Sequence, residues 1–156
     1  MQDFSNEIFT RIKNKVHEIH GSAVKVVGEY VDMPKEFPCV SVDEIFNIPS
    51  ELDSGNEPKY YSVTYRVQVF SNKKNGKRSE ARAIYSTIAD EMYAMNLIGK
   101  TYTTTPEVYN ASIYQIRATF DCHIRADGTM FRRWEDEIWQ FHRIIAYLNG
   151  VKAHRH

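Results

Sequence analysis

Residues 60–70 read YYSVTYRVQVF, and they decide how the rest of the chain folds. Apolar side chains occupy every second position, and polar side chains lie between them. Because successive side chains of a β-strand point to opposite faces, this alternation predicts a strand with one dry face and one polar face. The dry face consists of Tyr61, Val63, Tyr65, Val67 and Val69.

A basic, turn-rich loop follows this strand and leads directly into a helix. Residues 71–78 read SNKKNGKR, and apolar residues then recur at helical spacing. Ser79 or Asn75 is expected to cap the helix, because short polar side chains accept hydrogen bonds from its first free amides. The apolar stripe consists of Ala81, Ile84, Tyr85, Ile88, Met92 and Met95. Nothing between Tyr60 and Met95 is arranged for bond-making chemistry, which indicates a protein that works by presenting surfaces.

Towards the N-terminus, the sequence predicts one helix and two strands. Residues 3–20 have an amphipathic pattern that ends at Gly21. Strands are expected at residues 23–30 and 39–46, joined by an extended connection that contains two prolines. The polar stretch 47–59 contains prolines and a glycine, and it predicts a long loop between two strands.

Towards the C-terminus, the sequence predicts three more strands. The first is short and rich in threonine, and Pro106 limits it. The second is long and alternating, and the RADG sequence that follows is a hairpin signal before a returning strand. In chain order, the expected strands are residues 100–104, 112–124 and 129–133.

A last helix is predicted from about residue 134 to residue 148. Large aromatic side chains lie on more than one of its sides, and a helix that is apolar on two faces must bury both. One face can pack on the protein's own sheet and the other on a neighbouring subunit, so we expect an oligomer interface here. The expected interface residues are Trp134, Ile138, Trp139, Phe141 and Ile145.

These elements together predict an α+β fold. The sheet is expected to be mostly antiparallel or mixed and packed on one face by two helices, with an additional C-terminal helix. Residues 1–133 are expected to form the α+β domain, and residues 134–156 a helical extension and tail of the same domain. The opposite face of the sheet is expected to be too polar for a second core. It carries Arg66, Gln68, Gln115, Arg117, Asp121 and His123.

Composition excludes several classes of protein. Twenty basic and twenty acidic side chains cancel, so overall charge gives no argument for nucleic acid or an anionic membrane as partner. No apolar run is long enough to span a membrane, and the N-terminus lacks the pattern of a secretion signal. Cys39 and Cys122 are therefore expected to be reduced and buried, and a disulfide between them would require neighbouring strands.

The polar residues form no clear catalytic or metal site. His17 and His20 share one side of a helix, but no further ligand lies nearby in the sequence. Cys122 and His123 are adjacent on a strand and point to opposite faces, so they cannot form a nucleophilic pair within it. We therefore expect no catalytic residue, no metal and no cofactor.

One spacing resembles a catalytic set. Asp43, Glu57 and Lys59 have the order of the carboxylate–carboxylate–lysine set of metal-dependent nucleases. Such a site needs carboxylates that adjacent strands hold rigidly, and Glu57 falls in the predicted loop. A nuclease is therefore kept only as an alternative.

The basic loop is the strongest candidate for contact with a partner. Phosphate binding at the helix N-terminus, a solvated loop tip that protects the strand edge, and contact with an acidic protein surface all suit its charge. We favour the protein contact, because the neutral overall charge argues against a dedicated nucleic-acid binder. The loop and helix start carry five cations against Glu80 alone: Lys73, Lys74, Lys77, Arg78 and Arg82.

Four stretches, together with the amphipathic N-terminal helix, carry a family resemblance. They are residues 37–44 (FPCVSVDE), 65–72 (YRVQVFSN), 77–82 (KRSEAR) and 114–121 (YQIRATFD). This pattern resembles the small tail-terminator, or tail-completion, proteins of long-tailed bacteriophages and prophages. The resemblance covers roughly residues 3–133, and the helix after Arg133 is longer and more aromatic than the family pattern.

The resemblance implies a structural role without enzymatic activity. Family members form a ring, usually of six subunits, that caps the head-proximal end of the tail tube and stops its polymerisation. The implied partners are other copies of the chain, the tail tube protein and a head connector or stopper protein. DNA passes through the lumen of the ring without specific binding. The implied location is the virion tail, after synthesis in the bacterial host cytoplasm. Another head–tail joining component is the alternative within the same class.

Overall fold

The computed structural model describes residues 4–52, 55, 58–107, 110–125 and 127–131. It contains two helices and six strands within these residues. In chain order they are α1 (Ser5–His20), β1 (Lys25–Val27), β2 (Cys39–Leu52), β3 (Pro58–Ser71), α2 (Lys77–Ala94), β4 (Ile98–Glu107), β5 (Asn110–Arg125) and β6 (Met130–Phe131). The helix predicted from residue 134 to residue 148 lies outside the described residues.

All the described strands belong to one mixed sheet. The strand order is β1-β2-β3-β5-β4, and β6 pairs with β5. Only β1 and β2 run parallel, whereas the other described pairs are antiparallel. The strand around residues 60–70 lies at the centre, paired on both sides along most of its length. The predicted α+β fold with a mixed sheet is confirmed.

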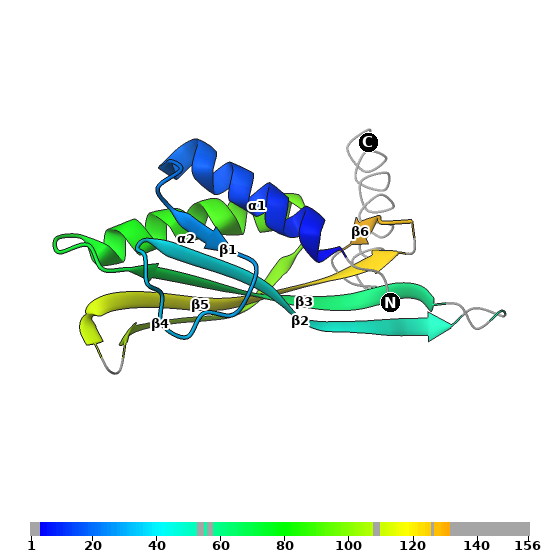
Figure 1. Cartoon of the computed structure of the whole chain (residues 1–156). Coiled ribbons are helices and arrows are strands. Elements are labelled where there is room, and N and C mark those ends of the chain that lie inside the picture. Colours follow the sequence, from blue (N-terminus) through cyan, green and yellow to red (C-terminus); the bar gives the residue numbers. More distant parts are fainter. Residues whose placement is uncertain (1–3, 53–54, 56–57, 108–109, 126, 132–156) are drawn as a thin grey trace, which may run out of the picture.

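Helices α1 and α2 lie side by side on one face of the sheet (Figure 1). Their buried side chains recur every three or four residues, as an amphipathic helix requires. The two helices cover the predicted dry face of the sheet, where Tyr65 and Ala118 are each 1% exposed and Phe120 is 0% exposed. The helix residues in this core are Ile8, Ile12, Val16, Ala81, Ile84, Ile88 and Met92.

The prediction of a loop at residues 47–59 is wrong. Strand β2 continues to Leu52 and pairs with β3 as far as the Leu52–Pro58 partners, which makes a long hairpin. A β-bulge separates Glu44 from Phe46. Pro49 is tolerated because the outer edge of β2 beyond Ser41 pairs with no described strand, and an edge position needs no amide donor. We call residues 44–52 and 58–64 the arm, and it projects beyond the helices in Figure 1.

Three other expected boundaries also differ from the structure. The strand expected at residues 23–30 is limited to Lys25–Val27, where it pairs with β2. The N-cap residue of α2 is Gly76, and no side chain caps this helix, whereas Ser79 or Asn75 was expected to do so. Pro106 was expected to limit its strand, but it lies inside β4 and pairs with Tyr114. A proline is tolerated there because β4 is an edge strand in the described sheet.

The hairpin predicted at residues 125–128 is confirmed. The Gly128 amide donates to the Arg125 carbonyl oxygen, and the Arg125 amide donates to the Thr129 carbonyl oxygen. Gly128 has a φ of 91°, a left-handed conformation that favours glycine. Strand β6 then returns along β5 with Met130 opposite Ile124.

Part of the second face of the sheet is covered, although it was expected to be too polar for a second core. Residues 28–38, which we call the strap, connect β1 to β2 and cross this face (Figure 1). Gln68 is fully buried and Gln115 is 5% exposed. A second, small core lies under the strap, made of Cys39, Phe70 and Ile113 with Val27, Val31 and Phe37 packed against them. The expectation that no core forms on this face is therefore wrong at this end of the sheet.

Truncating Phe120 should test the main core. Phe120 is fully buried and its ring packs against Tyr85 and Tyr93, so Phe120→Ala is expected to lower the free energy of unfolding by about 3–5 kcal/mol. Chemical denaturation measures the loss. Thr103→Ala, on an exposed position of β4, is the control and should change stability by less than about 0.5 kcal/mol. A similar effect of both substitutions would contradict the central role of the Phe120 ring.

Candidate interaction surfaces

The structure gathers the five predicted cations at one end of the molecule. Strand β3 ends at Ser71, the loop of residues 72–76 turns the chain, and α2 begins at Lys77. Gly76 allows this turn because its φ is 94°, a left-handed conformation that costs other residues free energy. We call residues 72–82 the basic end.

Most of these cations face solvent. Lys73, Lys74, Arg78 and Arg82 are exposed, and Lys77 is half-buried in the first turn of the helix. The nearby carboxylate of Glu80 is held by the Ser71 hydroxyl, which donates to its Oε1 at 2.8 Å. The predicted residues therefore form one accessible patch, as an electrostatic contact with a partner requires.

A cavity of about 600 Å³ opens beside the basic end. It lies between the end of α1, the residues just before β1 and the start of α2. Lys73 and Glu80 contribute charged groups to its lining, and His20 lines it from α1. The apolar part of the lining consists of Ala23, Val24, Pro38, Ala83 and Ile84. This volume is in the range of sites that accept small ligands or a few large side chains.

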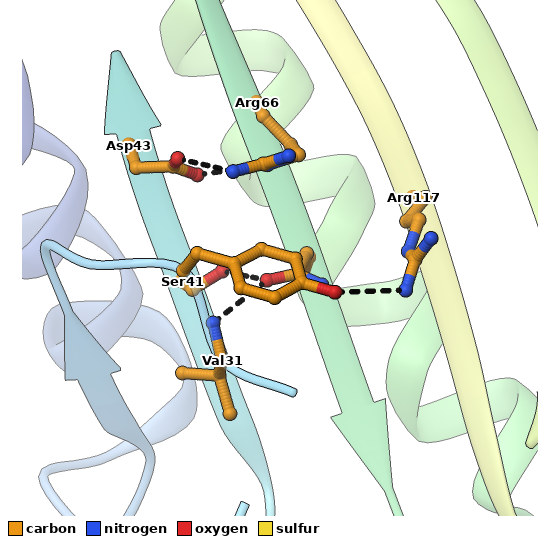
Figure 2. Close-up of polar contacts among 7 residues, drawn as sticks. Val31, Ser41, Asp43, Arg66 and Arg117 are labelled. Atoms are coloured by element: carbon orange, nitrogen blue, oxygen red, sulfur yellow. Dashed lines mark hydrogen bonds and ion pairs between the residues drawn. The ribbon is translucent and has the colours of Figure 1, made fainter. Parts of the chain in front are cut away.

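A buried polar network fixes the strap to the sheet (Figure 2). The Oε1 atom of Gln68 accepts hydrogen bonds from the Ser41 hydroxyl at 2.7 Å and from the Val31 amide at 3.2 Å. Gln68 is fully buried, so these bonds offset the cost of removing its amide group from water. The network therefore determines where the strap lies on the second face.

An ion pair continues this network towards the arm (Figure 2). The Arg66 guanidinium donates to both carboxylate oxygens of Asp43, at 3.1 and 2.6 Å. The Tyr30 ring lies over this guanidinium, 4.4 Å from its carbon, and the Tyr30 hydroxyl accepts from Arg117 at 3.5 Å. The hydrogen bond to Asp43 raises the pKa of Arg66 above its ordinary value. Arg66 is thus held as a cation that links β2, β3 and the strap.

A known virion contains a chain with this fold. One chain of the structure described as "Virion of native gene transfer agent (GTA) particle" superimposes with a TM-score of 0.54 and 12% sequence identity. The alignment covers 73% of this chain and 88% of that chain. At this identity, the likeness shows a shared fold. No protein-family model and no curated protein matches the sequence.

The residues considered for chemistry take part in structural contacts. Asp43 is engaged by Arg66, so its carboxylate oxygens already have donors. Glu57 lies outside the described residues. His17 Nε2 lies 2.9 Å from the Val24 carbonyl oxygen, and His20 Nε2 lies 2.7 Å from the Thr87 hydroxyl. Across the described ranges, no group of three His, Cys, Asp or Glu residues could hold a metal ion.

Both cysteines are free and buried, as predicted. They lie on β2 and β5, which β3 separates. Burial raises the pKa of Cys122 to about 12, and burial is also the main cause that raises the pKa of Cys39. Cys122 belongs to the core, whereas His123 on the other face lies with its Nδ1 atom 3.0 Å from the Ser62 hydroxyl. The two side chains therefore do not meet, as expected.

One predicted surface and the question of a membrane-spanning helix concern different parts of the chain. The expected oligomer interface at Trp134, Ile138, Trp139, Phe141 and Ile145 lies beyond the described residues. Within the described part of the chain, neither helix is long and apolar enough to cross a membrane.

Sequence reasoning missed one exposed apolar pair on the arm. Phe46 is 57% exposed and Ile48 is 54% exposed. In sequence they continue the alternation of Val40 and Val42, which are buried. The bulge after Glu44 adds one residue, and an added residue moves every later side chain to the other face of the sheet. The alternation was visible in the sequence, but its change of face was not.

Removing the buried amide should loosen the strap. Gln68→Leu leaves the Ser41 hydroxyl and the Val31 amide without their acceptor, so the free energy of unfolding should fall by about 1–3 kcal/mol. Hydrogen exchange at the Val31 amide should accelerate. The double variant Ser41→Ala/Gln68→Leu should lose less free energy of unfolding than the sum of the two single losses. It has no Ser41 hydroxyl that could be left without a partner. Strict additivity in denaturation would contradict this coupling.

Proposed function

We propose that this protein is a structural component of a phage-like virion and acts as a tail terminator. In this role it forms a ring on the head-proximal end of the tail tube, stops tube polymerisation and provides the surface on which the head docks. The observation that carries the proposal is the fold shared with a chain of the gene transfer agent virion, since the match covers 88% of that chain.

The four stretches that resemble tail terminators support the proposal, because they meet in space. Residues 39–44 of β2 pair with residues 65–70 of β3, and residues 114–120 of β5 pair with the other side of the same part of β3. Residues 77–82 begin the helix that packs against these strands. Stretches distant in the sequence therefore form one continuous part of the fold, which includes the basic end.

The proposed partners follow from this role. They are other copies of the chain in a six-membered ring, the tail tube protein, and a head connector or stopper protein. The exposed cations of the basic end support contact with an acidic protein surface in this assembly. The proposal includes no catalytic step, no cofactor and no specific DNA contact. The nuclease alternative has less support, because Arg66 engages the Asp43 carboxylate.

Particles that lack this protein should have overlong tails. A terminator stops the tube protein from adding further rings, so its loss should allow the tube to keep growing at that end. Electron microscopy of particles from cells that lack the protein measures tail length directly. Tails of normal length beside unattached heads would contradict the terminator role and assign the protein to another step of head–tail joining.

Reversing charge at the basic end should weaken assembly without unfolding the domain. In Lys73→Glu/Lys74→Glu/Lys77→Glu, three cations at the loop and helix start become anions, so an acidic partner surface is repelled. Incorporation of the protein into tails is the measurement. Thermal unfolding should remain cooperative, with a midpoint close to that of the wild type.

A charge-matched control separates the patch from net charge. Lys13→Glu/Lys35→Glu/Lys100→Glu changes the formal charge by the same amount at three exposed positions outside the basic end. This variant should enter tails as the wild type does. Equal loss of assembly in both variants would contradict a specific contact, and unfolding of the first variant would show that its lysines are needed for the fold.

A further inference from the structure

The molecule has complementary features at its two ends. The arm lies at one end of β3, and the basic end lies at the other (Figure 1). The cavity opens beside the basic end. Strand β3 has 14 residues, which corresponds to roughly 45 Å of paired strand. Because β3 is paired on both sides, it holds the two ends apart, and the arm of one molecule cannot reach its own cavity.

We propose that the arm of one copy docks on the basic end of a second copy, with Phe46 and Ile48 against the apolar lining of the cavity. This contact rests on the proposed ring and names the surfaces that would join its subunits. Both side chains lie on the same face of β2, opposite Thr64 and Ser62 of β3. They are more than half exposed, as anchor residues of an interface are before association.

Charge favours a second copy as the occupant. The arm carries Glu44 and Glu51 against Lys59, so its formal charge is negative. The basic end carries five cations against Glu80. The two ends therefore carry net charges of opposite sign, so copies placed head to tail bring unlike charges together.

The contact is expected to use side chains rather than added strand pairing. The bulge between Glu44 and Phe46 interrupts the outer edge of β2, and Pro49 has no amide hydrogen to donate. Both features disfavour addition of another strand along this edge. Phe46 and Ile48 project from the face of the sheet, which leaves them available to enter a cavity.

This arrangement also accounts for a closed assembly. An arm that binds a different surface on the next copy makes a heterologous contact, so each added copy leaves one arm and one cavity open. Where the rotation between successive copies closes, association ends when the last arm meets the first cavity, and the closed form is a ring.

Two defective variants test the contact in combination. Phe46→Asp/Ile48→Asp disables the arm but leaves the cavity intact, and Ala83→Trp fills the cavity but leaves the arm intact. Analytical ultracentrifugation should show concentration-dependent assembly of the wild type. Each variant alone should be monomeric, with a dissociation constant raised more than about thirtyfold. An equimolar mixture should form one-to-one dimers and nothing larger, because only one functional contact is available per pair.

A matched control and two outcomes decide the proposal. Met33→Asp places an acid at another exposed apolar position, 47% exposed, and should assemble as the wild type does. Assembly of the two variants like the wild type, or a mixture without dimers, would refute the contact while leaving a ring through other surfaces. A wild-type protein that stays monomeric at millimolar concentration would also refute the contact. The terminator role is judged separately, by tail length in particles that lack the protein.

Discussion

The hydrogen-bonded pairing of β3 with β2 and β5 is the constraint on which the rest of the structure depends. It fixes the face of each side chain along the central strands, so the residues that bind the helices and those that face the strap are set together. It also holds the arm and the basic end at opposite ends of a rigid strand. Surfaces for contact with other molecules are therefore separated by the same pairing that forms the core.

The second face of the sheet shows how polar residues stabilise a specific arrangement. Gln68 accepts from Ser41 and Val31, and Arg66 joins Asp43 while lying under the Tyr30 ring. These contacts position the strap, and a small core then forms beneath it. Asp43, which the sequence offered as a possible nuclease carboxylate, thus acts as a structural connection.

The proposed role as a virion subunit gives these surfaces a context. A virion subunit must remain soluble before assembly and bind several neighbours afterwards. Exposed cations at one end and exposed apolar residues on an acidic strand at the other suit such a role, because neither end can satisfy the other within one molecule. The bulge and Pro49 on the outer edge of β2 protect that edge against uncontrolled strand addition.

The sequence by itself determined the α+β class, the central strand, the two core helices and the position of the basic loop. Those features follow from local periodicity, since alternation and helical spacing are written into neighbouring residues. Only the tertiary structure decided that residues 47–52 are strand, that Phe46 and Ile48 lie on the second face, and that Gln68 is buried. Each of these features depends on a segment distant in the chain. Pairing with β3 extends β2 into the arm, and the bulge in that pairing moves Phe46 and Ile48 to the other face. The strap covers the side-chain amide of Gln68. Local sequence specifies a side chain's preference, but the pairing register decides what it meets.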